Sequence, residues 1–299
     1  MRILCIGDSN TWGYNPVNGF RHASRWTKVL QQMMPENEIV EEGMNGRTLL
    51  SVDPFMKERC GIAGLKMLLM SHKPIDLVVV MLGTNELKTS FECSAKYVAK
   101  GIEEFIKVIK DKEMWDRFSV PKLLVVSPVL IREELIVNGD AFGGYDEKSV
   151  RESKHMAEEI KFICEKYDVD FMNAADYAKA SLFDNIHMDE ENHGKLAVAI
   201  CGKIREINLH DTIKRVQLME QYFDDVQNLL KGEPKLCREN TKFQENMKIL
   251  TKYYEGGQWL KDYECDERGE LPGNLKRGIL SEDGFYNFLV KFEEKILSK

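Results

Sequence analysis

A serine near the N-terminus is the first residue whose type and position could do chemistry. The sequence GDSN at positions 7–10 directly follows Ile3–Ile6, a short apolar run typical of a strand. A serine on a tight turn at the carboxyl end of a strand presents its hydroxyl and backbone N–H to the crevice beyond the sheet. Ser9 is therefore a candidate nucleophile. The alternative is that Asp8 and Ser9 only cap a following helix, as such residues often do.

Two later turns offer hydrogen-bond donors to the same crevice. Gly46 follows the apolar run Glu38–Val40, and Asn85 follows Leu77–Met81. The backbone N–H groups of Ser9 and Gly46 and the side-chain amide of Asn85 could surround the oxyanion that forms when an ester is attacked. Alone, Gly46 would be an ordinary turn glycine and Asn85 a turn or cap residue. Their shared position after strands favours the oxyanion-hole interpretation.

A nucleophilic serine also needs a base, and His187 is the best candidate among six histidines. It lies in the segment FDNIHM at positions 183–188, with Asp184 three residues earlier. Asp184 would fix the tautomer of the imidazole and stabilise the imidazolium formed when His187 takes the proton of Ser9. His193 is the main competitor, and we interpret it as a solvated or capping histidine. The predicted catalytic residues are Ser9, Asp184 and His187.

The elements that must position these residues alternate between strand and helix patterns. Helical spacing of apolar residues separates five short β-branched runs, which predicts a parallel, doubly wound α/β sheet. The predicted strands are Ile3–Ile6, Glu38–Val40, Leu77–Met81, Leu123–Val126 and Val169–Met172. The predicted helices are Arg25–Met34, Cys60–Met70, Ala95–Ile109, Ser149–Tyr167 and Glu191–Ile207.

Strand signals stop after residue 208, and the rest of the chain reads as helix. The clearest amphipathic stretches there are Val216–Leu230 and Phe243–Tyr254. We therefore expect a catalytic α/β domain at residues 1–208 and a small all-α domain at residues 211–299. The aromatic residues Tyr253, Tyr254 and Trp259 of this second domain are expected to form core rather than an interaction surface.

Composition narrows the class of protein and of partner. Lys and Arg total 42 against 49 Asp and Glu, a net charge of −7 that disfavours nucleic acid and anionic membrane surfaces as partners. Seven scattered cysteines without a Cys-x-x-Cys pair suggest neither a disulfide framework nor a zinc cluster. No apolar run suits a signal peptide or a membrane span. These features predict a cytoplasmic protein without a bound metal.

Three motifs resemble those of the SGNH hydrolase superfamily, the GDSL-like esterases, and most closely its arylesterase and acyltransferase branch. They are GDSNTWGY at 7–14, EEGMNGRT at 41–48 and GTN at 83–85, followed by Asp184 and His187, and the resemblance spans roughly residues 1–207. It implies a flavodoxin-like three-layer α/β/α sandwich, the roles given above for these residues, no metal or organic cofactor, and a homo-oligomer. The positions that it implies for a small acyl pocket are Trp12, Thr84, Lys88 and Ile186.

Two residues depart from the pattern of that branch. Glu86 stands where the family usually has Asp, and Asn10 stands where acyltransferase relatives tend to have an apolar residue. A polar Asn10 beside the nucleophile would keep water near and so favour hydrolysis over acyl transfer. The C-terminal helical region resembles a small bacterial domain of unknown function, which implies no activity.

The expected function is hydrolysis of short-chain, acetyl-type carboxylic esters of small molecules through an acyl-enzyme on Ser9. The loop Leu130–Tyr145 is expected to contribute to specificity. Alternative enzymatic functions are a carbohydrate acetyl esterase acting on xylo-oligosaccharides and an acyltransferase. The non-enzymatic alternative is a catalytically silent scaffold that recruits a partner through the helical tail.

Overall fold

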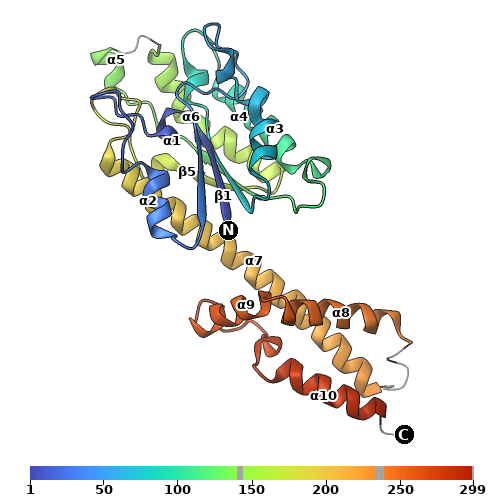
Figure 1. Ribbon diagram of the computed structural model, residues 1–299. Coiled ribbons are helices and arrows are strands. Elements are labelled where there is room, and N and C mark those ends of the chain that lie inside the picture. Colours follow the sequence, from blue (N-terminus) through green and yellow to red (C-terminus); the bar gives the residue numbers. More distant parts are fainter. Residues whose placement is uncertain (140–143, 233–236, 238, 298–299) are drawn as a thin grey trace. The chain divides into compact units, whose positions relative to one another are not determined.

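The computed structural model describes residues 1–139, 144–232, 237 and 239–297, and the chain divides into two compact units, Met1–Lys203 and Ile204–Lys299 (Figure 1). The first unit contains one sheet in which all five strands are parallel, in the order β2-β1-β3-β4-β5. All five predicted strands are present. Their bounds are β1 Arg2–Gly7, β2 Glu38–Gly43, β3 Leu77–Met81, β4 Lys122–Ser127 and β5 Asp170–Asn173.

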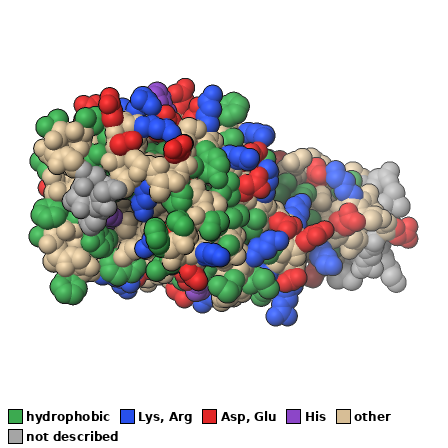
Figure 2. Space-filling model, turned by 90° about the horizontal axis from the view of Figure 1, so that it is seen from above, with side chains coloured by type: hydrophobic (Ala, Val, Ile, Leu, Met, Phe, Trp, Pro, Cys, Tyr) green, Lys and Arg blue, Asp and Glu red, His purple; other side chains and the backbone are tan. Residues whose placement is uncertain are grey.

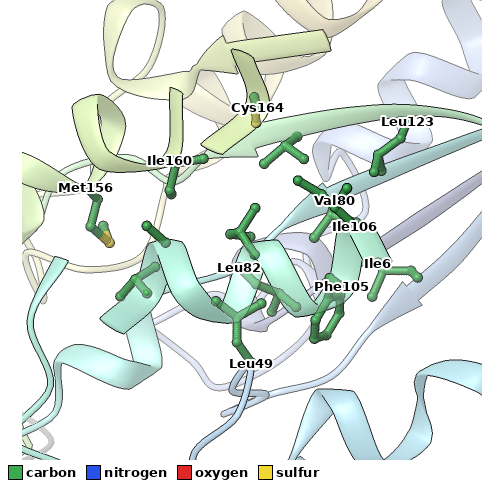
Figure 3. Close-up of a cluster of buried hydrophobic side chains, with 14 of the residues drawn as sticks. Ile6, Leu49, Val80, Leu82, Phe105, Ile106, Leu123, Met156, Ile160 and Cys164 are labelled. Atoms are coloured by element: carbon green, nitrogen blue, oxygen red, sulfur yellow. The ribbon is translucent and has the colours of Figure 1, made fainter. Parts of the chain in front are cut away.

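Helices cover both faces of this sheet, as the predicted three-layer sandwich requires. The sequence LVVVM of β3 is buried throughout, because a central parallel strand is covered on both sides. Side chains of α3, α4 and α6 form the core on one face, which Figure 3 shows around Leu82, Phe105 and Ile160. Helices α2 and α7 run along the other face (Figure 1). The bounds are α2 Trp26–Met33, α3 Gly61–His72, α4 Ala95–Lys110, α6 Glu147–Lys166 and α7 Glu190–Gly232.

Local signals explain where the two longest helices on the first face begin. The Ser94 side chain caps α4 by accepting from the N–H of Tyr97. Helix α6 begins with a reciprocal capping box between Asp146 and Ser149. Both helices then place apolar residues at helical spacing toward the sheet, so burial of that stripe stabilises each helix in its place.

Helix α7 is a single helix of 43 residues that includes both predicted helices Glu191–Ile207 and Val216–Leu230. The expected domain boundary at residues 208–211 lies within it, and the division between the compact units falls between Lys203 and Ile204. The stretch from 208 to 211 is polar at three of its four positions but contains neither Pro nor Gly. A change in polarity therefore does not interrupt the helix, because its backbone hydrogen bonds need no apolar side chains.

The second unit is all-α, as predicted. After α7, its helices are α8 Thr241–Glu255, α9 Gln258–Glu267 and α10 Gly284–Leu297. Tyr253 belongs to the buried core, and Tyr254 and Trp259 pack against that core half-buried. The indole N–H of Trp259 donates to the carbonyl of Ile279 at 2.8 Å. The expectation that these aromatic residues form core is confirmed.

The surface of the chain carries mixed charge. Acidic and basic side chains are interspersed on the face that Figure 2 presents.

All seven cysteines are free thiols. Among the described residues, no helix is long and apolar enough to cross a membrane, and no three His, Cys, Asp or Glu side chains are grouped to hold a metal ion.

A buried carboxylate links α7, α8 and α9 within the second unit. Asp262 is only 1% exposed and accepts two hydrogen bonds from the Arg215 guanidinium, at 2.7 and 2.6 Å. The hydroxyl of Tyr253 donates to it at 2.9 Å, and the amide of Gln258 donates at 3.1 Å. Such a group is stable only while its partners are present, because a buried charge without a counterion is costly.

Replacing Arg215 with Met should therefore destabilise the second unit. We expect a loss of about 2–4 kcal/mol in the free energy of unfolding, because Asp262 would stay buried without its cation. Lys214→Met is the matched control, since Lys214 is exposed on the same helix. Urea denaturation of both variants measures the effect, and equal stabilities would contradict this account.

Candidate active site

Ser9 is presented by a turn that only glycine at position 7 permits. A Cβ atom on Gly7 would lie 2.0 Å from Oγ1 of Thr11 and 2.9 Å from the carbonyl oxygen of Met81. Ser9 begins α1 (Ser9–Trp12), and the Asp8 side chain caps this short helix by accepting from the N–H of Asn10 at 2.9 Å. The capping interpretation is thus correct for Asp8. Ser9 instead directs its hydroxyl toward an imidazole.

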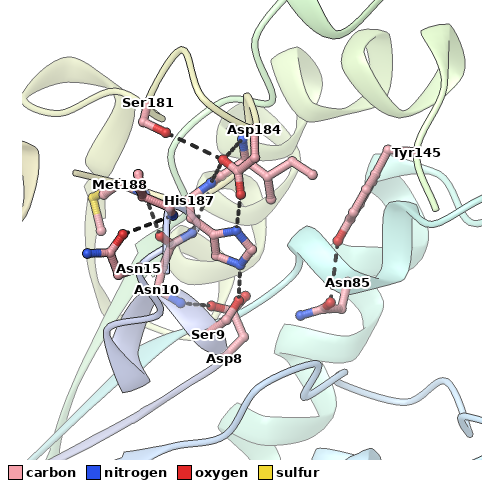
Figure 4. A network of polar contacts seen from close by, with 12 residues as sticks. Asp8, Ser9, Asn10, Asn15, Asn85, Tyr145, Ser181, Asp184, His187 and Met188 are labelled. Carbon is pink, nitrogen blue, oxygen red and sulfur yellow. Dashed lines mark hydrogen bonds and ion pairs between the residues drawn. The ribbon is translucent and has the colours of Figure 1, made fainter. Parts of the chain in front are cut away.

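That imidazole is His187, and it bridges Ser9 and Asp184 (Figure 4). Nε2 of His187 lies 2.8 Å from Oγ of Ser9, and Nδ1 lies 2.5 Å from Oδ2 of Asp184. The other carboxylate oxygen of Asp184 accepts from the backbone N–H groups of Ile186 and His187, at 3.1 and 3.0 Å. The carboxylate therefore fixes both the ring and the turn that carries it.

The geometry of Asn10 overturns its expected role. Its side chain is buried and points toward the His187 loop rather than into the pocket: Nδ2 donates to the carbonyl of Ile186 at 3.3 Å, and Oδ1 accepts from the N–H of Met188 at 2.9 Å. Both halves of the amide are engaged by the residues on either side of His187. Asn10 therefore holds the histidine loop against α1, and the argument that it retains water beside Ser9 is wrong.

Gly46 and Asn85 reach the same site from the loops after β2 and β3. Gly46 has φ +78°, which strains any other residue, and a Cβ atom there would lie 2.7 Å from Nε of Arg59 and displace its guanidinium. Asn85 donates from Nδ2 to the carbonyl of Arg47 at 3.1 Å. The Tyr145 hydroxyl donates to Oδ1 of Asn85 at 3.3 Å, which fixes the orientation of the amide (Figure 4).

A pocket of about 230 Å³ joins these groups. Of the predicted residues, Lys88 and Ile186 line it together with Ser9, Gly46, Asn85 and His187, whereas Asp184 lies buried behind His187. Trp12 and Thr84 are not part of its lining. The Trp12 ring lies against the Arg21 guanidinium, 5.4 Å from ring centroid to Cζ, and Thr84 is buried.

Four lining residues were not predicted: Tyr14, Asn45, Arg59 and Tyr145. The ring of Tyr14 has its centroid 4.8 Å from that of His187, so Tyr14 supplies the aromatic wall expected from Trp12. The sequence signal that could have identified Tyr14 is Gly13, which lies between Trp12 and Tyr14. Gly13 has φ +88° and ends α1, so the side chain that follows it turns back toward the site. Tyr145 ends the loop 130–145, part of which lies outside the described residues.

Comparison with known proteins identifies the family. The model of the GDSL-like Lipase/Acylhydrolase family matches residues 5–194. The chain belongs to this family. A second model, Domain of unknown function (DUF4298), matches residues 216–298. No protein among the curated sequences matches significantly.

Two of the solved structures similar to this GDSL-like acylhydrolase are named as esterases. Est24, a carbohydrate acetylesterase from Sinorhizobium meliloti, is 29% identical with a TM-score of 0.64, over 69% of this chain and 99% of its own. The native aryl esterase of M. smegmatis is 32% identical with a TM-score of 0.62, over 69% of this chain and 98% of its own. With the family match, this likeness shows that the chain is a carboxylic ester hydrolase.

Burial and charge shift several carboxyl groups of this acylhydrolase. Burial raises the pKa of Asp8 to about 6, although its hydrogen bond from Asn10 opposes the shift. Burial also acts to raise the pKa of Asp184, but the hydrogen bond and charge of His187 hold that pKa below its ordinary value. Asp184 therefore stays ionised beside His187, as an orienting carboxylate must.

We expected His193 to be a solvated or a capping histidine. It is fully buried rather than solvated, and it contacts the N-terminus of α2 as a capping residue would. Its Nδ1 accepts from the N–H of Trp26 at 3.4 Å, and its ring packs edge-on against His22 with centroids 5.2 Å apart. Burial lowers the pKa of His193 to about 3, so it is neutral near pH 7. His193 contacts the start of α2 rather than Ser9, so His187 is the histidine that reaches the Ser9 hydroxyl.

Glu86 is fully buried behind the pocket and holds the loop that carries Gly46. Its Oε1 accepts from the N–H groups of Leu49 and Leu50. Burial raises the pKa of Glu86 to about 7, and these N–H groups oppose the shift. The family's shorter Asp at this position would have to reach the same loop from farther away.

Replacing Glu86 with Gln should change how stability depends on pH. The folded state holds the proton more tightly than the unfolded state, where the pKa is 4.5, so wild-type stability is lost as pH rises from about 4.5 to about 7. Gln cannot ionise, so between pH 4 and pH 8 the variant should gain about 2–3 kcal/mol relative to wild type.

Urea denaturation at pH 4 and pH 8 measures this difference, with Glu58→Gln, an exposed residue, as control. A stability difference between Glu86→Gln and wild type that is the same at both pH values would show that Glu86 does not titrate in this way.

Proposed function

We propose that this acylhydrolase cleaves short-chain carboxylic esters through an acyl-enzyme on Ser9, with His187 as base and Asp184 as its orienting carboxylate. The observation that carries the proposal is the continuous hydrogen-bonded chain from Ser9 through His187 to the buried Asp184, at 2.8 and 2.5 Å, with Ser9 facing a pocket. This order of donors and acceptors is the one that activates a serine hydroxyl.

The reaction follows from the positions of these atoms. His187 Nε2 takes the hydroxyl proton as Oγ of Ser9 bonds to the carbonyl carbon of the ester, and the carbonyl oxygen becomes an oxyanion. The proton then passes to the leaving alcohol as the ester C–O bond breaks. Water attacks the acyl-enzyme by the reverse proton path, which releases the acid and restores Ser9. The backbone N–H groups of Ser9 and Gly46 and Nδ2 of Asn85 are the proposed oxyanion donors.

The size of the pocket favours a short acyl group. A volume of about 230 Å³ must hold the atoms on both sides of the ester, and Tyr14 and Ile186 form apolar walls. Hydrolysis is the proposed outcome because water reaches the site in large excess over any alcohol. Acyl transfer remains the alternative, since the buried Asn10 no longer argues against it. Cytoplasmic location and a homo-oligomer stay predictions from the sequence.

A carbohydrate acetyl ester is the second candidate substrate, because one similar structure is that of a carbohydrate acetylesterase. Acetylated xylo-oligosaccharides and p-nitrophenyl acetate distinguish the candidates when compared at equal concentration. A higher kcat/KM for the sugar ester would assign the carbohydrate function, and a higher value for the aryl acetate would assign the general esterase function.

Removal of the Ser9 hydroxyl should abolish turnover. For Ser9→Ala we expect a fall of at least about 1,000-fold in kcat on p-nitrophenyl acetate, since no nucleophile remains. Butyrate and octanoate esters, measured alongside, should be hydrolysed progressively less well by the wild type. Ser71→Ala, an exposed serine on α3, is the control. Equal turnover by Ser9→Ala and wild type would exclude the mechanism, and inactivity of both would favour the scaffold function.

Tyr145 should act by holding the Asn85 amide rather than by touching the reacting atoms. In Tyr145→Phe the hydrogen bond to Oδ1 of Asn85 is lost, and we expect kcat to fall about tenfold, less than the 100-fold or more expected for loss of an oxyanion donor. KM should change little. Tyr177→Phe, at an exposed tyrosine, is the control. A change in KM alone would instead indicate a role in binding.

A further inference from the structure

Two cationic side chains line the pocket that contains Ser9. They are Arg59, from the loop between β2 and α3, and Lys88, which follows the short helical turn Thr84–Leu87 after β3. Lys88 is half-buried, and burial lowers the pKa of its ammonium group, with the nearby charge of Arg59 acting in the same direction. The charges of Asp53, Asp8 and Glu86 oppose this shift from a greater distance, so the two cations share the pocket with carboxylates that lie beyond its lining.

The carboxylates around this pair are engaged elsewhere. Asp53 pairs with Nη1 of Arg59 at 2.6 Å and accepts from the N–H of Phe55. Glu86 accepts from the backbone of the Gly46 loop, and Asp8 caps α1. Within the described parts of the chain, no carboxylate oxygen lies within 4.0 Å of Nζ of Lys88. Among the described residues, Arg59 therefore forms an ion pair, and Lys88 forms none.

We propose, on the basis of the function above, that Lys88 determines specificity by binding an anionic group of the substrate, so that the preferred ester is one that carries a carboxylate. A partly desolvated ammonium without a counterion is costly, and a carboxylate of the substrate would satisfy it with a charge-assisted hydrogen bond. A neutral ester of the same shape would leave it unsatisfied. The preference thus follows from the pocket and not from the protein's overall charge of −7, which repels anions.

The carboxylate could lie on the alcohol side or on the acyl side of the ester, and two pairs of matched substrates distinguish these. On the alcohol side, 4-acetoxybenzoate is compared with its neutral methyl ester, by release of the phenol from the acetyl ester. On the acyl side, monomethyl glutarate is compared with methyl valerate, by pH-stat. Within each pair only the anionic group differs in kind, so the ratio of kcat/KM values measures its recognition.

The variants are Lys88→Met, Lys88→Arg and the control Lys100→Met, which removes an exposed lysine on α4. In at least one pair, wild type should prefer the anionic ester, and Lys88→Met should lower kcat/KM for that ester about tenfold or more, mainly through KM. The neutral ester should change less than about threefold, Lys88→Arg should retain the preference, and added NaCl should weaken it.

Two failures of this experiment have different meanings. If wild type hydrolyses the neutral and anionic members of both pairs equally well, and Lys88→Met changes neither ratio, the assignment of Lys88 is wrong while the esterase mechanism stands. If Ser9→Ala hydrolyses these esters as fast as wild type, the proposed function itself is wrong. Loss of the preference in Lys100→Met would also overturn the assignment, because it would indicate a general charge effect.

Discussion

The hydrogen bond between Ser9 and His187 joins residues that are 178 positions apart, and the rest of the first unit is arranged so that this bond can form. Ser9 is anchored because β1 is the second strand of the sheet and is paired on both sides. The histidine lies on a turn between β5 and α7, far less constrained by strand pairing. Asn10 and Asp184 supply that constraint. Asn10 binds the backbone of the turn from α1, and Asp184, which is part of the turn, accepts from two of its N–H groups. The geometry of the pair is therefore set by buried amide and carboxylate groups.

The strand order explains why three loops distant in sequence supply one site. With β1 between β2 and β3, the loops after these strands that carry Ser9, Gly46 and Asn85 are neighbours at the carboxyl edge. The loop after β2 leaves the edge of the sheet. Glu86, in the neighbouring loop after β3, accepts hydrogen bonds from its backbone and so fixes its position. This support requires a buried carboxyl group, and burial raises the pKa of Glu86. The shape of the pocket is therefore coupled to the protonation of Glu86.

Prediction from the sequence succeeded where a signal was periodic or contiguous. The five strands, the layers and the position of Ser9 at a strand end follow from apolar runs and turn residues, whereas His187 and Asp184 are indicated mainly by the resemblance to the SGNH hydrolases. Prediction failed for side-chain direction. Trp12 and Tyr14 are two residues apart, and only the left-handed backbone at Gly13 decides which ring faces the site. Arg59 and Tyr145 come from irregular loops, whose positions depend on contacts that no local pattern encodes.

Side-chain direction also explains why Asn10 and His193 were interpreted wrongly as residues in contact with water. Both are polar residues close in sequence to Ser9 or His187, and both are buried: the amide of Asn10 binds the backbone of Ile186 and Met188, and Nδ1 of His193 accepts from the backbone of Trp26. A polar residue near a nucleophile has two physical solutions, exposure to water or satisfaction by the backbone, and the sequence does not distinguish them. Lys88 differs from both, because it faces the pocket and has no carboxylate partner among the described residues. Of these three polar side chains, Lys88 is the one that lines the pocket, where a molecule from solution can reach it.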